Sequence, residues 1–157
     1  MSNHLTKNDI DLLAILQDDA RLSNSELSER VAMSASSCWR RVKSLEDSGI
    51  IARYSAILEP AKMGLQFDAI VHVQLSRHDS DGVQQFLTMV RDRPEIVECT
   101  ATTGTADYHL RVVCQDVAAY NTFLEHVLFK LTCLRSAQTN MVLKKIKSHG
   151  VLSPPVG

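Results

Sequence analysis

The chain has 157 residues, of which 45% are hydrophobic and 22% charged, which is the composition of an ordinary globular protein. This length allows one large domain or two small ones, and small domains often gain stability by oligomerising because each buries little of its surface. The net charge of -1 excludes a uniformly basic nucleic-acid-binding protein, so any DNA-binding surface must be a local cluster of cations.

Signals for metal binding, membrane insertion and secretion are missing from the sequence. The four cysteines have no C-x-x-C spacing, which disfavours a zinc site and predicts small buried thiols in a reducing cytosol. The N-terminal residues lack the basic region and apolar run of a secretory signal, and no stretch approaches the ~18 apolar residues of a membrane span. We therefore expect a cytoplasmic protein that binds no metal and no membrane.

The N-terminal part of the chain predicts two short helices. Thr6, with Asp9 three residues later, caps a first helix that runs to about residue 19 or 20. Ser23 and Glu26 form the capping box of a second helix. Apolar residues recur at helical spacing in both, so each helix is expected to bury one face.

A third helix is predicted to begin at the cap Ser34 and to end at Gly49, which tolerates left-handed backbone. Cys38, Val42 and Leu45 recur at i, i+4 and i+7 and predict its buried stripe. Two short helices joined by about three residues form the helix-turn-helix pattern. The remaining surface of the third helix carries hydroxyls and cations suited to the major groove and to phosphates. The expected DNA-binding residues on it are Ser34, Ser36, Ser37, Arg40, Arg41, Lys43 and Ser44.

The next stretch, residues 50–58, predicts a wing of two short strands around a turn. Arg53 joins the expected DNA-binding residues as a phosphate contact, whereas Tyr54 fits a structural role equally well. Trp39, the single tryptophan, is expected to pack against this wing, with a DNA contact as the alternative. The cations of the third helix alone fit a solvated amphipathic helix equally well, but the capped helices before them and the apolar run after them favour DNA binding.

The periodicity changes after residues 59–66, where Pro60 and Gly64 predict a linker. We therefore expect a DNA-binding domain over residues 1–58, a second domain over 67–148 and a flexible tail over 149–157. In the second domain, alternating and helical patterns predict strands at 67–75, 96–102, 108–114 and 134–146, and helices within 79–93 and 116–131.

The resulting order, β-α-β-β-α-β, is the ferredoxin-like arrangement of the α+β class, an antiparallel sheet with two helices on one face. Together with the N-terminal region, the predicted fold is a winged helix-turn-helix followed by a ferredoxin-like domain. The sheet face without helices needs a partner, and dimerisation through that face is the simplest solution.

The chain resembles the Lrp/AsnC family of feast/famine transcription regulators over nearly its whole length, from about Leu5 to Lys147. The resemblance implies a dimer built through the C-terminal domain, often assembled further into a tetramer of dimers, so we expect a homo-oligomer that is a dimer, tetramer or octamer. It also implies an amino acid or related metabolite bound in clefts between dimers. The segments that carry it, in order and spacing, are residues 9–11, 16–24, 33–46, 49–51 and 104–108.

The last of these segments contains the Gly-x-x-Asp turn that lines the effector cleft in the family. Amide groups beside Gly104 can donate to a carboxylate, and Asp107 can accept from an ammonium group. Many members have an acidic residue where this chain has Thr105. A plain hairpin turn is the alternative interpretation, since Gly and Asp are common in turns. The expected effector-binding residues are Thr102, Gly104, Thr105, Ala106, Asp107 and Tyr108.

We interpret the chain as a sequence-specific transcription regulator whose partners are double-stranded DNA, an amino-acid effector and copies of itself. It is not expected to be an enzyme or to need a cofactor, because the sequence has no nucleophile elbow, phosphate loop, His-Glu metal spacing or paired carboxylates. His72 is expected on the sheet surface, and His109, beside the turn, either packs or lines the effector site. The alternative is a metabolite-sensing oligomer or an enzyme on a ferredoxin-like domain without DNA binding.

Overall fold

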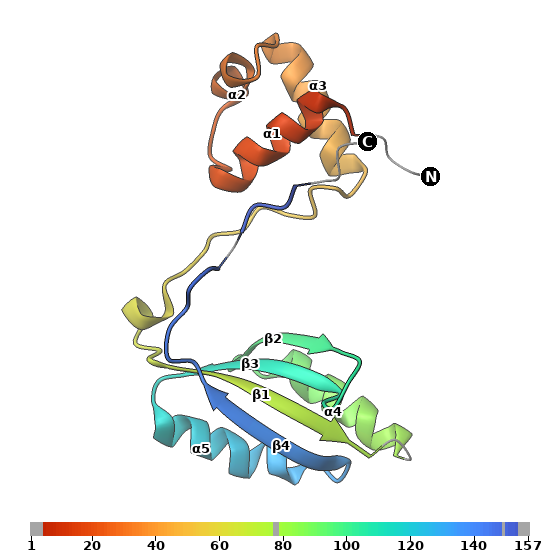
Figure 1. Ribbon diagram of the computed structural model, residues 1–157, viewed down its shortest axis with the longest axis vertical. Coiled ribbons are helices and arrows are strands. Elements are labelled where there is room, and N and C mark those ends of the chain that lie inside the picture. Colours follow the sequence, from red (N-terminus) through yellow and green to blue (C-terminus); the bar gives the residue numbers. More distant parts are fainter. Residues whose placement is uncertain (1–4, 77–78, 149, 154–157) are drawn as a thin grey trace. The chain divides into compact units, whose positions relative to one another are not determined.

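The computed structural model describes residues 5–76, 79–148 and 150–153 of the chain (Figure 1). The chain divides into two compact units, one made of residues 1–57 together with the segment from residue 147 onward, and the other of Leu58–Ile146. Of the predicted flexible tail, residues 149 and 154–157 lie outside the described residues. Within the described ranges, no helix is long and apolar enough to cross a membrane.

Three helices build the first unit, and each begins where the sequence predicts. Thr6 and Asp9 form a capping box at the first helix, and Ser23 and Glu26 form another at the second. The Ser34 hydroxyl accepts a hydrogen bond from the Ser37 amide at 3.3 Å and caps the third. The helices are α1 (Lys7–Asp18), α2 (Asn24–Arg30) and α3 (Ala35–Asp47).

The core of this unit forms where the three helices meet. Leu12 of α1 and Cys38 of α3 are fully buried, and Leu27 of α2 is nearly so. Val42 and Leu45 are buried as well, which confirms the stripe predicted for the third helix. Because this stripe faces the other helices, the opposite side of α3 must face away from the core.

An ion pair joins the middle of α3 to the start of α1. The Arg41 guanidinium donates from Nη1 to Asp9 Oδ1 at 2.8 Å and to the Thr6 hydroxyl at 3.0 Å. The Thr6 amide donates to the other oxygen of Asp9 at 2.8 Å. Burial raises the pKa of Asp9, but the hydrogen bonds with Thr6 and the Arg41 charge outweigh it and hold that pKa below its ordinary value.

The turn between α2 and α3 contains a strained residue. Ala32 has a φ of 50°, in the left-handed region that glycine adopts most readily. The turn is closed by the Met33 amide, which donates to the Ser28 carbonyl at 3.0 Å. Left-handed backbone costs a residue with a Cβ about 1 kcal/mol, so the packing of the flanking helices must hold this conformation.

The stretch that follows α3, called segment 50–58 below, corrects one prediction. Gly49, with a φ of 74°, ends α3 as expected, but this fully described segment is extended and contains no β-strand. The prediction of two short strands around a turn is therefore wrong. The run has no Gly, Pro, Asn or Asp to reverse the chain within it. The Tyr54 hydroxyl donates instead to Glu46 Oε1 at 3.0 Å and ties the segment to α3.

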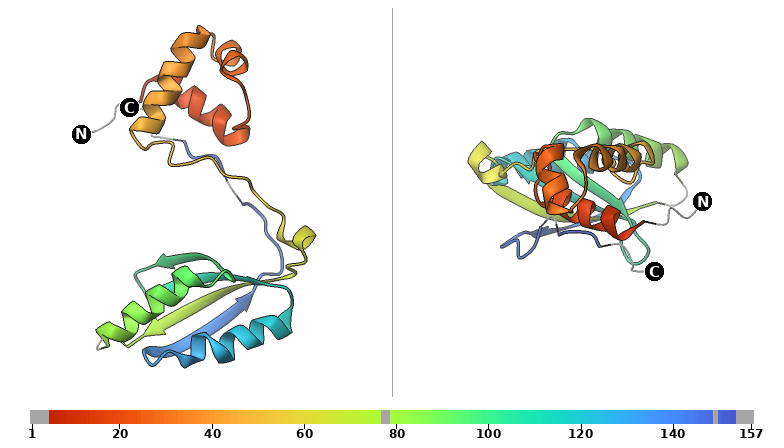
Figure 2. Two further views of the ribbon diagram at one scale, coloured as in Figure 1. Left: turned by 180° about the vertical axis from the view of Figure 1, so that it is seen from behind. Right: turned by 90° about the horizontal axis from the view of Figure 1, so that it is seen from above.

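The second unit has the predicted β-α-β-β-α-β order. Its four strands form one antiparallel sheet in the order β2-β3-β1-β4, and both α-helices cover the same face (Figure 2). Two short 3-10 helices, η1 (Pro60–Met63) and η2 (Leu128–Lys130), lie before β1 and after α5. The main elements are β1 (Phe67–Leu75), α4 (Ser80–Asp92), β2 (Ile96–Ala101), β3 (Tyr108–Cys114), α5 (Val117–His126) and β4 (Leu134–Met141).

Strict alternation along β1 separates the two faces of this sheet. Every second residue from Phe67 to Leu75 is buried against the helices, where Phe86 and Phe123 complete the core. The last strand ends at Met141, so the predicted extension to residue 146 is wrong. The strand β4 ends here because its partner β1 begins at Phe67. Beyond Met141 the structure has one more hydrogen bond between them, from the Val142 amide to the Asp68 carbonyl.

Acid should weaken the first unit through Asp9. Because the folded pKa of Asp9 lies below the unfolded value of about 4, its stabilisation is fully present above that value and is lost as the pH falls through the folded pKa. We expect Arg41→Ala to lower the free energy of unfolding by about 1 kcal/mol at pH 7 and by less at pH 3. Urea unfolding at both pH values measures this. Arg40→Ala, on the exposed side of α3, is the control, and equal losses for Arg41→Ala at the two pH values would contradict the assignment.

Candidate DNA interface and ligand pocket

The side of α3 away from the core forms one polar stripe. Ser36, Trp39, Arg40 and Lys43 are all exposed. The last three lie three, four and seven residues after Ser36, so the group shares one side of the helix. This group is called the outer face of α3 below. A capped helix whose exposed side carries cations and a small hydroxyl has the form that enters a major groove.

The three cations predicted to bind DNA lie in different surroundings. Arg40 is exposed on the outer face, whereas Arg41 is half-buried and paired with Asp9. Lys43 is exposed and lies 3.0 Å from Asp47 one turn further on, and the hydrogen bond to Asp47 raises the pKa of Lys43. Arg40 is therefore the cation best placed for DNA, while Arg41 also holds the two helices together.

A polar cavity of about 340 Å³ brings several predicted DNA-binding residues together. It opens between α3 and the start of α1, and the Asp9 carboxylate that pairs with Arg41 also lines it. Ser34 and Ser36 lie apart from it at the first turn of α3, where their hydroxyl oxygens are 3.4 Å from each other. The predicted residues that line the cavity are Ser37, Arg40, Arg41 and Ser44.

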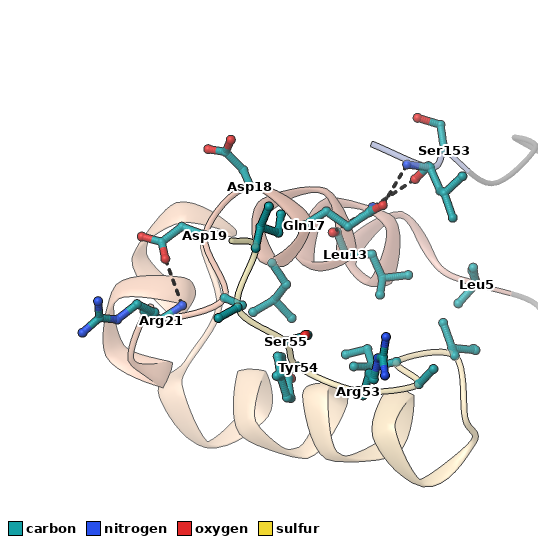
Figure 3. Close-up of a pocket in the computed structure, with 18 residues that line it drawn as sticks. Leu5, Leu13, Gln17, Asp18, Asp19, Arg21, Arg53, Tyr54, Ser55 and Ser153 are labelled. Carbon is teal, nitrogen blue, oxygen red and sulfur yellow. Dashed lines mark hydrogen bonds between the residues drawn. The ribbon is translucent and has the colours of Figure 1, made fainter. Parts of the chain in front are cut away.

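Arg53 lies away from this cavity. It belongs to segment 50–58 and lines a separate, largely apolar groove along α1 (Figure 3). The structure therefore does not bring Arg53 together with the predicted residues of α3.

Trp39 is the residue of the outer face that the sequence reasoning misplaced. Its side chain is 53% exposed, so the expectation that it packs against a wing is wrong. Segment 50–58 forms no hairpin that would cover it. The spacing contained the signal, because Trp39 lies three residues after Ser36 and four before Lys43 and so shares their side of the helix.

In the second unit, a polar pocket of about 290 Å³ opens on the sheet face without helices, beside the 103–106 turn. We call it the turn pocket. Thr105 and Ala106 are the predicted effector residues that line it. The sequence reasoning had considered His109 for such a site but not the other contributions of the sheet, although alternation along β1 places His72 and Gln74 on this face. The remaining lining residues are Thr103, His72, Gln74, His109, Ser136 and Gln138.

The other predicted effector residues shape the turn or lie on the far face of the sheet. Gly104 has a φ of 129°, which a residue with a side chain rarely adopts. Thr102 closes the turn through its amide, which donates to the Asp107 carbonyl at 3.0 Å. Asp107 accepts a hydrogen bond from the Leu75 amide at 2.9 Å and so ties the turn to the end of β1. The Tyr108 ring packs in the core, 4.8 Å from the ring of Phe86.

Hydrogen bonds organise the floor of the turn pocket. Asn140 contacts His72 Nε2 at 2.9 Å, and His72 Nδ1 lies 2.7 Å from His109 Nδ1. With the Asn140 amide as donor, His72 accepts at Nε2 and its Nδ1–H donates to His109 Nδ1. Gln74 accepts from the Ser136 hydroxyl at 2.8 Å and donates to the Thr105 carbonyl. The pocket thus offers fixed donors and acceptors to a small polar ligand.

Comparison with known proteins matches both units. Residues 68–152 match the Lrp/AsnC ligand binding domain, and residues 5–52 match a winged helix-turn-helix DNA-binding domain. The leucine-responsive regulatory protein of Escherichia coli is 36% identical over 148 residues, covering 94% of this chain and 90% of that protein. The E. coli DNA-binding transcriptional activator DecR is 34% identical over 143 residues, covering 91% and 94%.

Solved structures agree over the same length. The crystal structure of a transcriptional regulator from Neisseria meningitidis in complex with L-Met has a TM-score of 0.90 at 40% identity, covering 94% of this chain and 96% of that one. The E. coli AsnC structure, at 22% identity and a TM-score of 0.82, has the same fold. The chain therefore belongs to the Lrp/AsnC family of transcription regulators, with a helix-turn-helix domain that matches winged DNA-binding domains in sequence and is followed by a ligand-binding domain.

Proposed function

We propose that this regulator holds operator DNA on the outer face of α3 and that an amino acid in the turn pocket controls this binding. The outer face of α3 supports the proposed DNA binding, because the buried stripe leaves Arg40, Trp39 and Lys43 exposed on one side of a capped helix. The protein works in the cytoplasm beside the DNA that it binds, and it catalyses no reaction. Its DNA-binding domain spans residues 1–58, a linker spans 59–66 and the ligand-binding domain spans 67–148.

Each part of the proposed interface has a separate task. Arg40 contacts a phosphate or a guanine edge, and the hydroxyls of Ser37 and Ser44 beside it donate hydrogen bonds to a phosphate. Trp39 places its ring against a thymine methyl group, since an exposed apolar ring in the major groove finds apolar surface there. Arg53 reaches a neighbouring phosphate from segment 50–58.

The effector is proposed to be an amino acid for two reasons. The turn pocket, at about 290 Å³, is large enough for one, and its polar lining suits a zwitterion. The relative from N. meningitidis was solved in complex with L-Met, which supports the same class of ligand here. Thr105 stands where many members of the family have an acidic residue, so recognition of the ammonium end differs in this chain.

A homo-oligomer completes the proposal. The sheet face without helices carries the 40% exposed Ile70 beside an ionic cluster, in which Asp68 pairs with Arg111 at 2.8 Å and with Lys145 at 2.6 Å. A second copy that packs on this face covers the apolar surface and keeps the charges paired. The assembly is proposed to be a dimer that associates further into a tetramer or octamer.

Salt dependence tests the role of Arg40. If Arg40 contacts one phosphate, Arg40→Ala should reduce the slope of log affinity against log salt by about 0.9 in magnitude without changing protein stability. A titration of operator DNA at several salt concentrations measures the slope. Arg91→Ala removes an exposed cation from α4 in the other unit and serves as the control. An unchanged slope together with unchanged affinity for Arg40→Ala would remove this residue from the interface.

The fluorescence of Trp39, the single tryptophan, reports its contact with DNA directly. Operator DNA should quench this emission, and Trp39→Ala should weaken discrimination at one A·T base pair by about 1 kcal/mol. Trp39→Phe keeps an apolar ring and should retain most of the preference. If operator DNA quenches the emission fully but Trp39→Ala leaves the base preference unchanged, Trp39 contacts the DNA backbone and not a base.

Calorimetry with each amino acid tests the effector site. We expect at least one to bind the wild type, and Gln138→Ala to weaken it about tenfold through the loss of a hydrogen bond to a charged group. Thr122→Ala, on the exposed side of α5, is the matched control. A ligand whose affinity is unaffected by both Gln138→Ala and Gly104→Val binds elsewhere. Failure of every amino acid to bind would end the effector proposal and leave the DNA interface standing.

A further inference from the structure

A large groove, largely apolar, runs through the DNA-binding unit beside the polar cavity, with which it shares Leu5 and Ile50. It has a volume of about 950 Å³ and lies between α1 and segment 50–58 (Figure 3). Leu13 and Leu16 line it from α1, and Ile50, Ile51 and Ile57 line it from the segment. Apolar surface of this extent in a small unit needs a cover.

The chain itself returns to this groove near its C-terminal end. The Leu152 amide donates to Gln17 Oε1 at 2.8 Å, and Gln17 Nε2 donates to the Leu152 carbonyl at 3.0 Å. Gln17 Nε2 also donates to the Leu13 carbonyl at 3.1 Å, one turn back, which fixes the carboxamide on the helix. Both backbone groups of Leu152 are thus paired by one side chain, in the way that a neighbouring strand would pair them.

We propose that residues 151–153 are a strap, a docking segment whose backbone seats on Gln17 and forms one edge of the apolar groove of the DNA-binding unit. Leu152 and Ser153 belong to the groove lining. The strap carries no charge, and its docking rests on the backbone hydrogen bonds of Leu152, because the side chains of Val151 and Leu152 are 52% and 81% exposed. The occupant is therefore a segment of the same chain.

The strap gives the ligand-binding unit a second connection to the DNA-binding unit. The first is the chain through η1 into β1, and the second is the chain that leaves β4 at Met141 and reaches the strap ten residues later. Docking of the strap is thus proposed to connect the end of β4 with α1 by a route other than the linker. This coupling rests on the proposed effector function, whereas the docking itself does not.

The docking is tested on the full chain with Gln17→Ala, with a chain that ends at Gly150, and with both changes together. Trypsin cuts after Arg53, which lies in the groove wall, so both changes should speed this cleavage about fivefold. The combined variant should be cleaved no faster than the shortened chain, because both changes remove the same contact. Exchange of the Leu152 amide proton, followed by NMR, should also be about fivefold faster in Gln17→Ala than in the wild type.

Cleavage after Arg91 in α4 is the internal control of each digest, and Gln85→Ala on the same helix is the matched variant. The proposal would be overturned if the shortened chain were cleaved after Arg53 at the wild-type rate. It would also be overturned if the effects of Gln17→Ala and of the shortening on this rate were additive in the combined variant. If protection of Arg53 from trypsin rose with protein concentration and were the same with and without the strap, a second copy of the chain would occupy the groove instead. None of these measurements uses DNA or effector, so they stand apart from the tests of the proposed function.

Discussion

The contact between α3 and α1 determines what this protein can offer to DNA. Cys38 and Val42 bury one side of α3 against Leu12, and the Arg41–Asp9 ion pair adds a directional link beside that apolar seam. Apolar burial alone would allow the helix to rotate by some degrees, since it has no preferred direction. A hydrogen-bonded ion pair has a preferred direction. The Arg41–Asp9 pair therefore keeps Arg41 at the helix junction and Arg40 pointing outward.

The central strand of the second unit has a comparable role. One face of β1 buries valines against α4 and α5, so the other face presents His72 and Gln74 at a fixed spacing. The 103–106 turn completes the pocket because Asp107 ties it to the end of the same strand. A single strand thus supports the core on one side and the ligand surface on the other, and core packing positions the polar groups that a ligand meets.

The sequence predicted what depends on neighbouring residues and missed what depends on distant ones. Capping boxes, the Cys38 stripe and alternation in β1 are local patterns, and all were confirmed. The end of β4 depends on where its partner strand begins, which no local pattern gives. Segment 50–58 is the exception, because its lack of turn-forming residues was readable in the sequence and a hairpin was still predicted. Two other contacts join residues far apart in the chain, so sequence spacing cannot predict them. They are the contribution of Ser136 to the turn pocket and the pairing of Gln17 with Leu152.

The strained turn at Ala32 has an evolutionary consequence. Glycine would adopt the observed φ of 50° without the Cβ penalty, and alanine codons become glycine codons by one nucleotide change. The chain is thus a single step away from a stabilising mutation that leaves both binding surfaces untouched. Such a reserve lets a lineage tolerate destabilising substitutions on the outer face of α3, the surface proposed to contact operator DNA.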